Sequence, residues 1–177
     1  LIWEFHGDRS NDRLGFSVSI SANGTRIAVG SPGYNKDAGQ VKVFDENETN
    51  SRWIAQPALI GEGKGEGFGA SVSISAEGDK IAIGAPYHNA STGKVYIYNE
   101  INGDWKPNSK KLTGFSSEDR FGCSVSLSGD GSQLAIGAPN KRATKSGYVV
   151  MYYSNFEQKI DISSNGDLFC WSVKLSS

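Results

Sequence analysis

The sequence predicts an all-β fold in which one antiparallel unit is repeated along the chain. A glycine followed by an alternating, serine-rich strand recurs at Gly15, Gly69 and Gly122, and a weaker copy starts at Cys170. The copies are roughly 50 residues apart, a period typical of propellers, solenoids and arrays. Each of the first three copies is followed by a glycine-containing dipeptide that favours a tight hairpin turn. These three observations predict an array of β-hairpins.

Each repeat begins with an acidic residue three positions before its glycine position. The four acids are Asp12, Glu66, Asp119 and Asp167. A short acidic side chain in front of a strand accepts hydrogen bonds from backbone amides, so we expect these acids to hold the turn. Their recurrence argues against paired glycosidase carboxylates, because such a pair is needed only once.

The first two strands of each repeat follow from their residue patterns. Residues 17–21 and their counterparts alternate serine with branched aliphatic residues, which places the serines on one face of a strand. The hairpin turns lie at Asn23-Gly24, Glu77-Gly78 and Asp130-Gly131. The returning strands, at residues 26–32, 80–86 and 133–139, are apolar or small after their first residue and end at a proline. Such runs indicate strands buried on both faces.

A polar loop leads from each second strand into two further strands. The third strands are expected at residues 41–44, 95–98 and 149–152, and the more polar fourth strands at 53–60, 105–112 and 156–160. We expect no helix. Four antiparallel strands, from a small inner one to a polar outer one, predict a β-propeller blade. A β-solenoid has parallel strands, which hairpin turns do not allow.

The repeats predict three complete blades in a single domain of 177 residues. Their approximate bounds are 12–62, 66–114 and 119–162, with an orphan strand at 1–5 and another at 169–176. Closed propellers typically have four to eight blades. We therefore expect a segment of a larger propeller, with association of several copies as the alternative.

The repeat resembles the FG-GAP repeat of integrin α-chain propellers and of many surface and secreted proteins. Phe68-Gly69 and Phe121-Gly122 precede the first strand, and Gly84-Ala85-Pro86 and Gly137-Ala138-Pro139 end the second. The first copy is looser, with Leu14-Gly15 and Gly30-Ser31-Pro32. Integrin-type repeats often hold calcium between the first two strands, through alternating carboxylates. Residues 21–25, 75–79 and 128–132 offer at most two carboxylates each, and calcium needs several oxygen ligands. We expect neither a metal nor a cofactor.

The composition limits the classes of partner. Eighteen basic and nineteen acidic residues give a net charge of −1, so no electrostatic field favours nucleic acid. No apolar run reaches the roughly 18 residues of a membrane-spanning helix, so we expect no direct membrane insertion. Cys123 and Cys170 fall at nearly equivalent repeat positions and could form a disulfide, although two separate thiols are favoured.

Three N-glycosylation sequons lie in predicted turns or loops. Their acceptor residues are Asn23, Asn47 and Asn89. Because sequons are used only in the secretory route, this placement favours a protein that is secreted, lumenal or at the cell surface.

The sequence offers no recognisable catalytic constellation. His6 and His88 do not recur in the repeats, and no serine lies in a Gly-x-Ser-x-Gly elbow. The glycine-rich segment 61–67 lacks the Gly-Lys-Ser/Thr ending of a phosphate-binding loop. We therefore expect a non-enzymatic protein.

The predicted function is that of a protein-binding or scaffolding module with an adhesion-like role. Loops on one face of a propeller suit recognition. Here these are residues 33–38, 87–92 and 140–146, and the candidate partner-binding residues are Tyr87, His88, Lys141, Arg142 and Lys145. The partner would be another protein, the remaining blades of the same propeller, or glycans. The alternatives are a carbohydrate-binding lectin propeller, an enzyme whose catalytic residues lie in other blades, and an architectural subunit of a larger complex.

Overall fold

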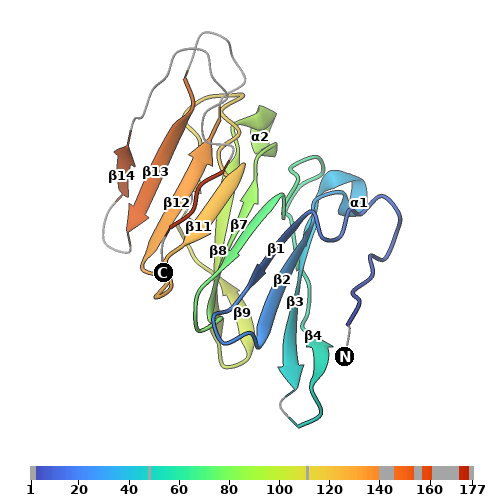
Figure 1. Ribbon diagram of the computed structural model, residues 1–177. Helices are drawn as coiled ribbons and strands as arrows, with labels where there is room; N and C mark the ends of the chain where they lie inside the picture. Colours follow the sequence, from blue (N-terminus) through green and yellow to red (C-terminus); the bar gives the residue numbers. More distant parts are fainter. Residues whose placement is uncertain are drawn as a thin grey trace.

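The chain folds into three antiparallel sheets that lie side by side like consecutive propeller blades (Figure 1). The computed structural model describes residues 3–47, 49–110, 112–139, 146–153, 157–160 and 172–175. Blade 1 contains β1 (Ser17–Ile20), β2 (Arg26–Ser31), β3 (Gln40–Asn47), β4 (Arg52–Ala55) and β5 (Leu59–Ile60). Blade 2 contains β6 (Ser71–Ile74), β7 (Lys80–Ala85), β8 (Lys94–Ile101), β9 (Asp104–Pro107) and β10 (Leu112–Thr113). Blade 3 contains β11 (Ser124–Leu127), β12 (Gln133–Ala138), β13 (Tyr148–Tyr153) and β14 (Glu157–Ile160).

The sheet topology confirms the predicted all-β fold of four-stranded antiparallel blades. In each blade the first strand pairs with the second, the second with the third, and the third with the fourth. The fourth strand was expected to be continuous, and this is wrong in blades 1 and 2. β4 and β5 both pair with β3 but are separated by residues 56–58, where Pro57 has no amide to donate to the sheet.

The repeated serines join each blade to the next. The Ser17 hydroxyl donates to the Gly69 carbonyl at 2.8 Å, and Ser71 repeats this contact with Gly122. The Ser19 hydroxyl accepts from the Ile74 amide at 3.1 Å, and Ser73 accepts from Leu127 at 2.9 Å. The serine face of each inner strand is therefore a blade-to-blade hydrogen-bonding surface.

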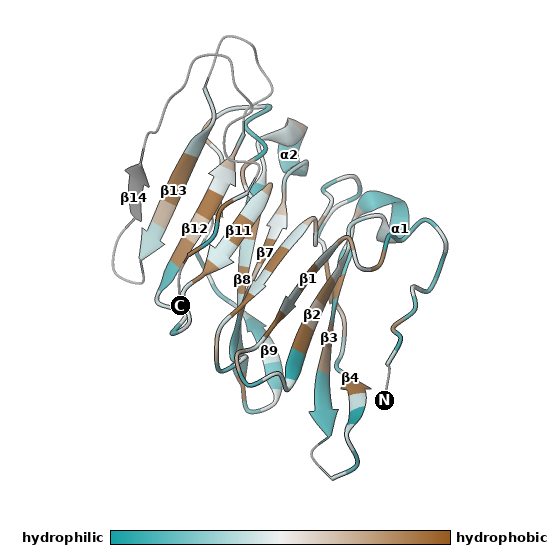
Figure 2. Ribbon diagram, viewed as in Figure 1, coloured by the Kyte–Doolittle hydropathy of each residue, from teal (hydrophilic) through white to brown (hydrophobic). Residues whose placement is uncertain are grey.

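The hydrophobic core lies between neighbouring blades. Phe68 and Phe121, the aromatic residues of the Phe-Gly pairs, are at most 1% exposed within two interblade clusters. The glycines of the motif allow this packing, because a Cβ on Gly84 would lie 2.0 Å from the Gly122 carbonyl oxygen of the next blade. Brown apolar bands cross the central strands, whereas the loops are mostly teal (Figure 2).

Two helical turns occur where no helix was expected. α1 (Tyr34–Asp37) and α2 (His88–Ser91) lie between the second and third strands of blades 1 and 2. Three consecutive residues in each turn have φ between 47° and 60°, so the turns are left-handed. The Ala90 and Ser91 carbonyls accept from the Glu118 and Arg120 amides of the next blade. These bonds offset the strain of left-handed backbone at residues other than glycine.

The ends of the chain differ from the expected orphan strands. Residues 3–7 form no strand, and the Phe5 ring packs on Phe44 with 4.2 Å between the ring centroids. Residues 172–175 have no strand assignment either, yet the Leu175 amide donates to the Ser126 hydroxyl at 2.9 Å. This bond repeats those between blades, so residues 172–175 take the place of the inner strand of a following blade.

Candidate binding surfaces

The loop after β7 brings two of the predicted site residues together. Tyr87 is 44% exposed, and His88 begins α2. Lys141, Arg142 and Lys145, the other predicted loop residues, lie outside the described residues. The described part of this surface is therefore formed by blade 2 and the blades next to it.

A buried carboxylate holds His88 in place. The Glu66 side chain is 3% exposed, and its Oε2 lies 2.8 Å from His88 Nδ1. The Tyr96 hydroxyl on β8 donates to the same oxygen at 3.1 Å. Burial, followed by the charges of Glu66 and Glu62, raises the pKa of Tyr96 far above its ordinary value, so this phenol remains a donor. Because Glu66 engages Nδ1, Nε2 is the ring nitrogen left for an outside partner.

Tyr87 is fixed between two blades. Its amide donates to the Glu66 carbonyl at 3.2 Å, and a Cβ on Gly67 would lie 2.7 Å from its ring. The Arg120 guanidinium of blade 3 lies 5.4 Å from the ring centroid, within cation–π range. We define Tyr87, His88, Glu66, Tyr96 and Arg120 as the loop site. The arrangement presents an aromatic ring and an imidazole on a rigid base.

The repeated acids have the expected structural role in two of the three described blades. Asp119 accepts from the Phe115 and Ser116 amides at 3.0 and 2.8 Å, and from the Tyr148 hydroxyl at 2.8 Å. Glu66 accepts from the Gly63 amide at 3.3 Å. Asp12 is 2% exposed, and its Oδ2 has no partner among the described residues. Asp167 lies outside them. Sequence reasoning missed the tyrosine and histidine partners, because they come from repeat positions that are not equivalent.

A second surface, the β1 face, was not predicted. Phe16, Val18 and Ile20 are 60%, 59% and 55% exposed on one side of the inner strand of blade 1. Val72 and Ile74, at the corresponding positions of β6, are 8% and 7% exposed because blade 1 covers them. Blade 2 covers β11 in the same way. The alternation of serine and aliphatic residues predicts an apolar face on each inner strand. Because the alternation is the same in all three strands, it does not indicate which of these faces is exposed.

The three sequons differ in their surroundings. Asn23 and Asn89 are exposed, in a hairpin turn and in α2 respectively. Asn47 was expected in a loop, but it is the last residue of β3 and pairs with Arg52. Its amide oxygen accepts from the Thr49 amide, so the strand end leads directly into a turn.

The hairpin loops use their acids for their own turns. Asp130 Oδ1 accepts from the Ser128 hydroxyl at 2.6 Å and from the Ser132 amide at 3.0 Å. These bonds lower the pKa of Asp130 to about 2. In the described part of the chain, no group of three acidic, histidine or cysteine side chains comes together as a metal site. Cys123 is half-buried, and burial raises the pKa of its thiol, whereas Cys170 lies outside the described residues.

Comparison with known proteins supports the assignment of the repeat and the fold. Residues 113–150 match the family model described as the FG-GAP repeat, which confirms the resemblance in the third repeat. A putative 6-phosphogluconolactonase from Bacteroides uniformis is similar with a TM-score of 0.56 and 17% identity over 81% of this chain. TolB from Acinetobacter baumannii is similar with a TM-score of 0.52 and 12% identity over 86% of this chain. The chain spans 39% and 33% of the length of these two structures, and identities this low show the fold alone.

No helix among the described residues is long and apolar enough to cross a membrane.

Proposed function

We propose that this chain is a non-enzymatic, protein-binding segment of a β-propeller and that the β1 face is its principal contact surface. The observation that carries this proposal is the exposure of Phe16, Val18 and Ile20 beside two equivalent faces that are buried. When large apolar side chains are exposed together on one strand, they usually mark a surface at which another protein segment binds. The interfaces between blades 1 and 2 and between blades 2 and 3 indicate what kind of partner fits.

The partner that fits the β1 face is a further blade of the same repeat type, beyond blades 1–3. Such a blade would offer serines to the Ile20 amide and the Gly15 carbonyl, as blade 1 does for Ile74 and Gly69. A head-to-tail second copy is disfavoured, because Leu175 already bonds to Ser126 on the open side of blade 3. Completion by another blade is therefore favoured over self-association.

The loop site gives the proposed segment a second, recognition surface. Tyr87 and His88 are held by Glu66 and Arg120, so little side-chain freedom would be lost on binding. In the described part of the chain His88 is hydrogen-bonded to a carboxylate, and no serine or cysteine side chain donates to it. This arrangement favours recognition of another protein, in an adhesion-like role, over catalysis.

An extracellular, cell-surface or lumenal location accompanies this proposal. It is supported by the FG-GAP repeat at residues 113–150 and by the exposed sequons at Asn23 and Asn89. We expect the protein from its native source to lose mass on removal of N-linked glycans. An unchanged mass would contradict glycosylation while leaving the β1 face untouched.

The β1 face can be tested by repeating blade 1 within the chain. Residues 1–61 joined to residues 8–177 would supply a preceding blade, because Gly7 and Gly61 are equivalent positions of the repeat. We expect the Ile20 amide of the second copy to exchange its hydrogen at least about tenfold more slowly than in the natural chain. Val18→Asp in that copy should abolish the protection. A folded extra blade that leaves Ile20 unprotected, or concentration-dependent protection of the natural chain by self-association, would overturn the proposed partner.

A further inference from the structure

A small polar hollow lies between blades 2 and 3, at the end of the blades that carries the β-hairpin turns. Its volume is about 140 Å³. Its polar lining includes Lys80, Asn99, Asn108, Lys110, Gln133 and Tyr152. Ile97, Leu127 and Leu134 form an apolar floor and are at most 8% exposed. The hollow thus combines two cationic side chains and several side-chain amides above a buried apolar floor.

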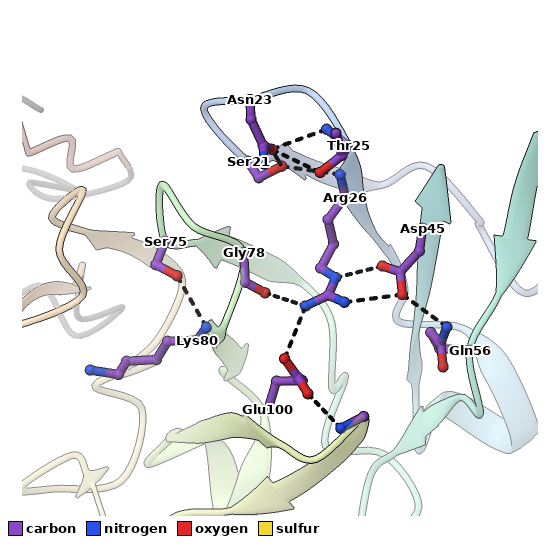
Figure 3. Close-up of polar contacts among 11 residues, drawn as sticks. Ser21, Asn23, Thr25, Arg26, Asp45, Gln56, Ser75, Gly78, Lys80 and Glu100 are labelled. Carbon is purple, nitrogen blue, oxygen red and sulfur yellow. Dashed lines mark hydrogen bonds and ion pairs between the residues drawn. The ribbon is translucent and has the colours of Figure 1, made fainter. Parts of the chain in front are cut away.

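The equivalent place between blades 1 and 2 is filled by an ion pair. Arg26 Nη2 donates to Asp45 Oδ2 at 3.0 Å, and Nη1 donates to the Gly78 carbonyl at 2.9 Å (Figure 3). Glu100 of blade 2 approaches Nη1 at 3.8 Å, and Gln56 donates to Asp45. The hydrogen bond with Asp45 raises the pKa of Arg26, and the charges of Asp45, Glu100 and Asp79 act in the same direction. Here the protein supplies both the cation and its anions.

Between blades 2 and 3 the cation remains but the anions do not. Lys80 pairs with Asn99 in the sheet, at the repeat position where Arg26 pairs with Asp45. Ser132 replaces Asp79 in the facing hairpin. The repeat position of Glu100 is Ser154 in the sequence, which lies outside the described residues. Lys110 adds a second positive charge to the lining.

The two lysines have no carboxylate partner among the described residues. Lys80 Nζ donates to the Gly131 carbonyl at 2.6 Å, and Lys110 Nζ lies 4.7 Å from the centre of the Tyr152 ring. The acids of the adjoining hairpins face their own turns, since Asp79 accepts from Ser75 and Asp130 accepts from Ser128 and Ser132. The hollow is therefore positively charged, and the described residues supply no counterion within it.

We propose that this hollow binds one small oxyanion group, a carboxylate, sulfate or phosphate, beside the Asn99 amide, which stands at the repeat position of the Asp45 carboxylate. Lys80 and Lys110 supply the charge, and the Asn99 amide supplies a neutral donor. Since a water in liquid takes about 30 Å³, the volume accommodates such a group with a few waters. The site depends on the covered blade 2–3 interface, so it is independent of the β1 face and of the loop site.

The test is an NMR titration of the natural chain with sodium acetate, sodium sulfate or sodium phosphate, at constant ionic strength set with sodium chloride. We expect saturable shifts of the Gly131 and Ser132 amides with at least one anion. Acetate acting alone identifies a carboxylate ligand, whereas sulfate or phosphate identifies a tetrahedral oxyanion. Absence of saturation with all three anions overturns the proposal.

Three variants separate this site from general charge effects. Asn99→Asp recreates the Arg26–Asp45 pairing, so we expect it to keep its thermal stability and to weaken anion binding by at least about tenfold. Lys110→Gln should weaken binding by about threefold or more. Lys64→Gln removes the same charge from the exposed segment before β6, where the adjacent Gly65 bonds to α1 rather than to the hairpin turns, and should change binding by less than about twofold. Equal loss in the two lysine variants, or unchanged binding in folded Asn99→Asp, contradicts the site.

Discussion

Ile20 and Ile74 occupy the same position of the repeat and carry the same side chain, yet they are 55% and 7% exposed. The difference arises entirely from the neighbour, because blade 1 covers β6 and no described blade covers β1. The local pattern of a blade therefore specifies its strands but not its burial. Stability at an equivalent position should depend on whether the neighbouring blade is present, and matched substitutions measure this dependence.

The largest effect is expected at the glycine that allows two blades to meet. A Cβ on Gly84 would lie 2.0 Å from the Gly122 carbonyl oxygen and 2.3 Å from Ser71 Oγ, so backbone atoms of blade 3 would have to move. We expect Gly84→Ala to lower the free energy of unfolding by about 3 kcal/mol or more. Gly63→Ala is the control, because a Cβ added there would meet no atom within 4 Å and the φ of Gly63 is not positive. Chemical denaturation of both variants provides the measurement, and equal stabilities would be inconsistent with close blade packing.

The isoleucine pair tests the comparison directly. Ile74→Ala should cost about 2 to 5 kcal/mol, because it empties part of the core between blades 1 and 2. Ile20→Ala should cost at most about 1 kcal/mol, which reflects strand propensity alone. Urea unfolding at equal protein concentration measures both values. If Ile20→Ala were as costly as Ile74→Ala, the β1 face would already be covered in the natural chain.

A smaller effect is expected from the serine that joins blades 2 and 3. Ser73→Ala leaves the Leu127 amide without its acceptor, and we expect a loss of about 1 kcal/mol. Hydrogen exchange should accelerate at Leu127 and remain unchanged at Ile74, whose acceptor is Ser19. Ser10→Ala, at an exposed position before blade 1, serves as the control. Uniform acceleration at both amides would indicate global destabilisation rather than loss of one blade contact.

Much of each blade could be predicted from the repeat. Its inner strand follows from the local alternation of serine and aliphatic residues, and its hairpin turns follow from the position of glycine. The left-handed turn at Asn35 and Lys36 could not, since neither residue is a glycine and the Lys36 carbonyl accepts from the Gly65 amide, which lies in the segment leading into blade 2. Tertiary packing also determines the Glu66 contact with His88, because the two residues belong to different segments of blade 2.

The blade 2–3 hollow could be predicted only in part from the sequence. Its signal is the change from Asp45 to Asn99 between aligned repeats, which is visible in the sequence. The meaning of that change depends on sheet register, because only the pairing of Asn99 with Lys80 shows that a cation has lost its counterion. Comparison of repeats within one chain thus becomes informative once the register is known.

The smallest effect concerns the hairpin turns, whose internal hydrogen bonds are the same in blade 1 and in blade 3. Asn23 in blade 1 and Asp130 in blade 3 accept the same three bonds, from the preceding serine hydroxyl and from the amide and hydroxyl two residues later. Asp130 alone can titrate, and these bonds lower its pKa to about 2 from an ordinary value of 3.8. The stabilisation by the carboxylate is therefore complete above about pH 4 and is lost as the pH falls through about 2. We expect amide exchange at Gly131 to accelerate over that range relative to Gly24, after correction for intrinsic rates, and Asp130→Asn to remove the difference. A parallel change at Gly24 would mean that the whole sheet responds to acid, and that the two turns do not differ by one carboxylate alone.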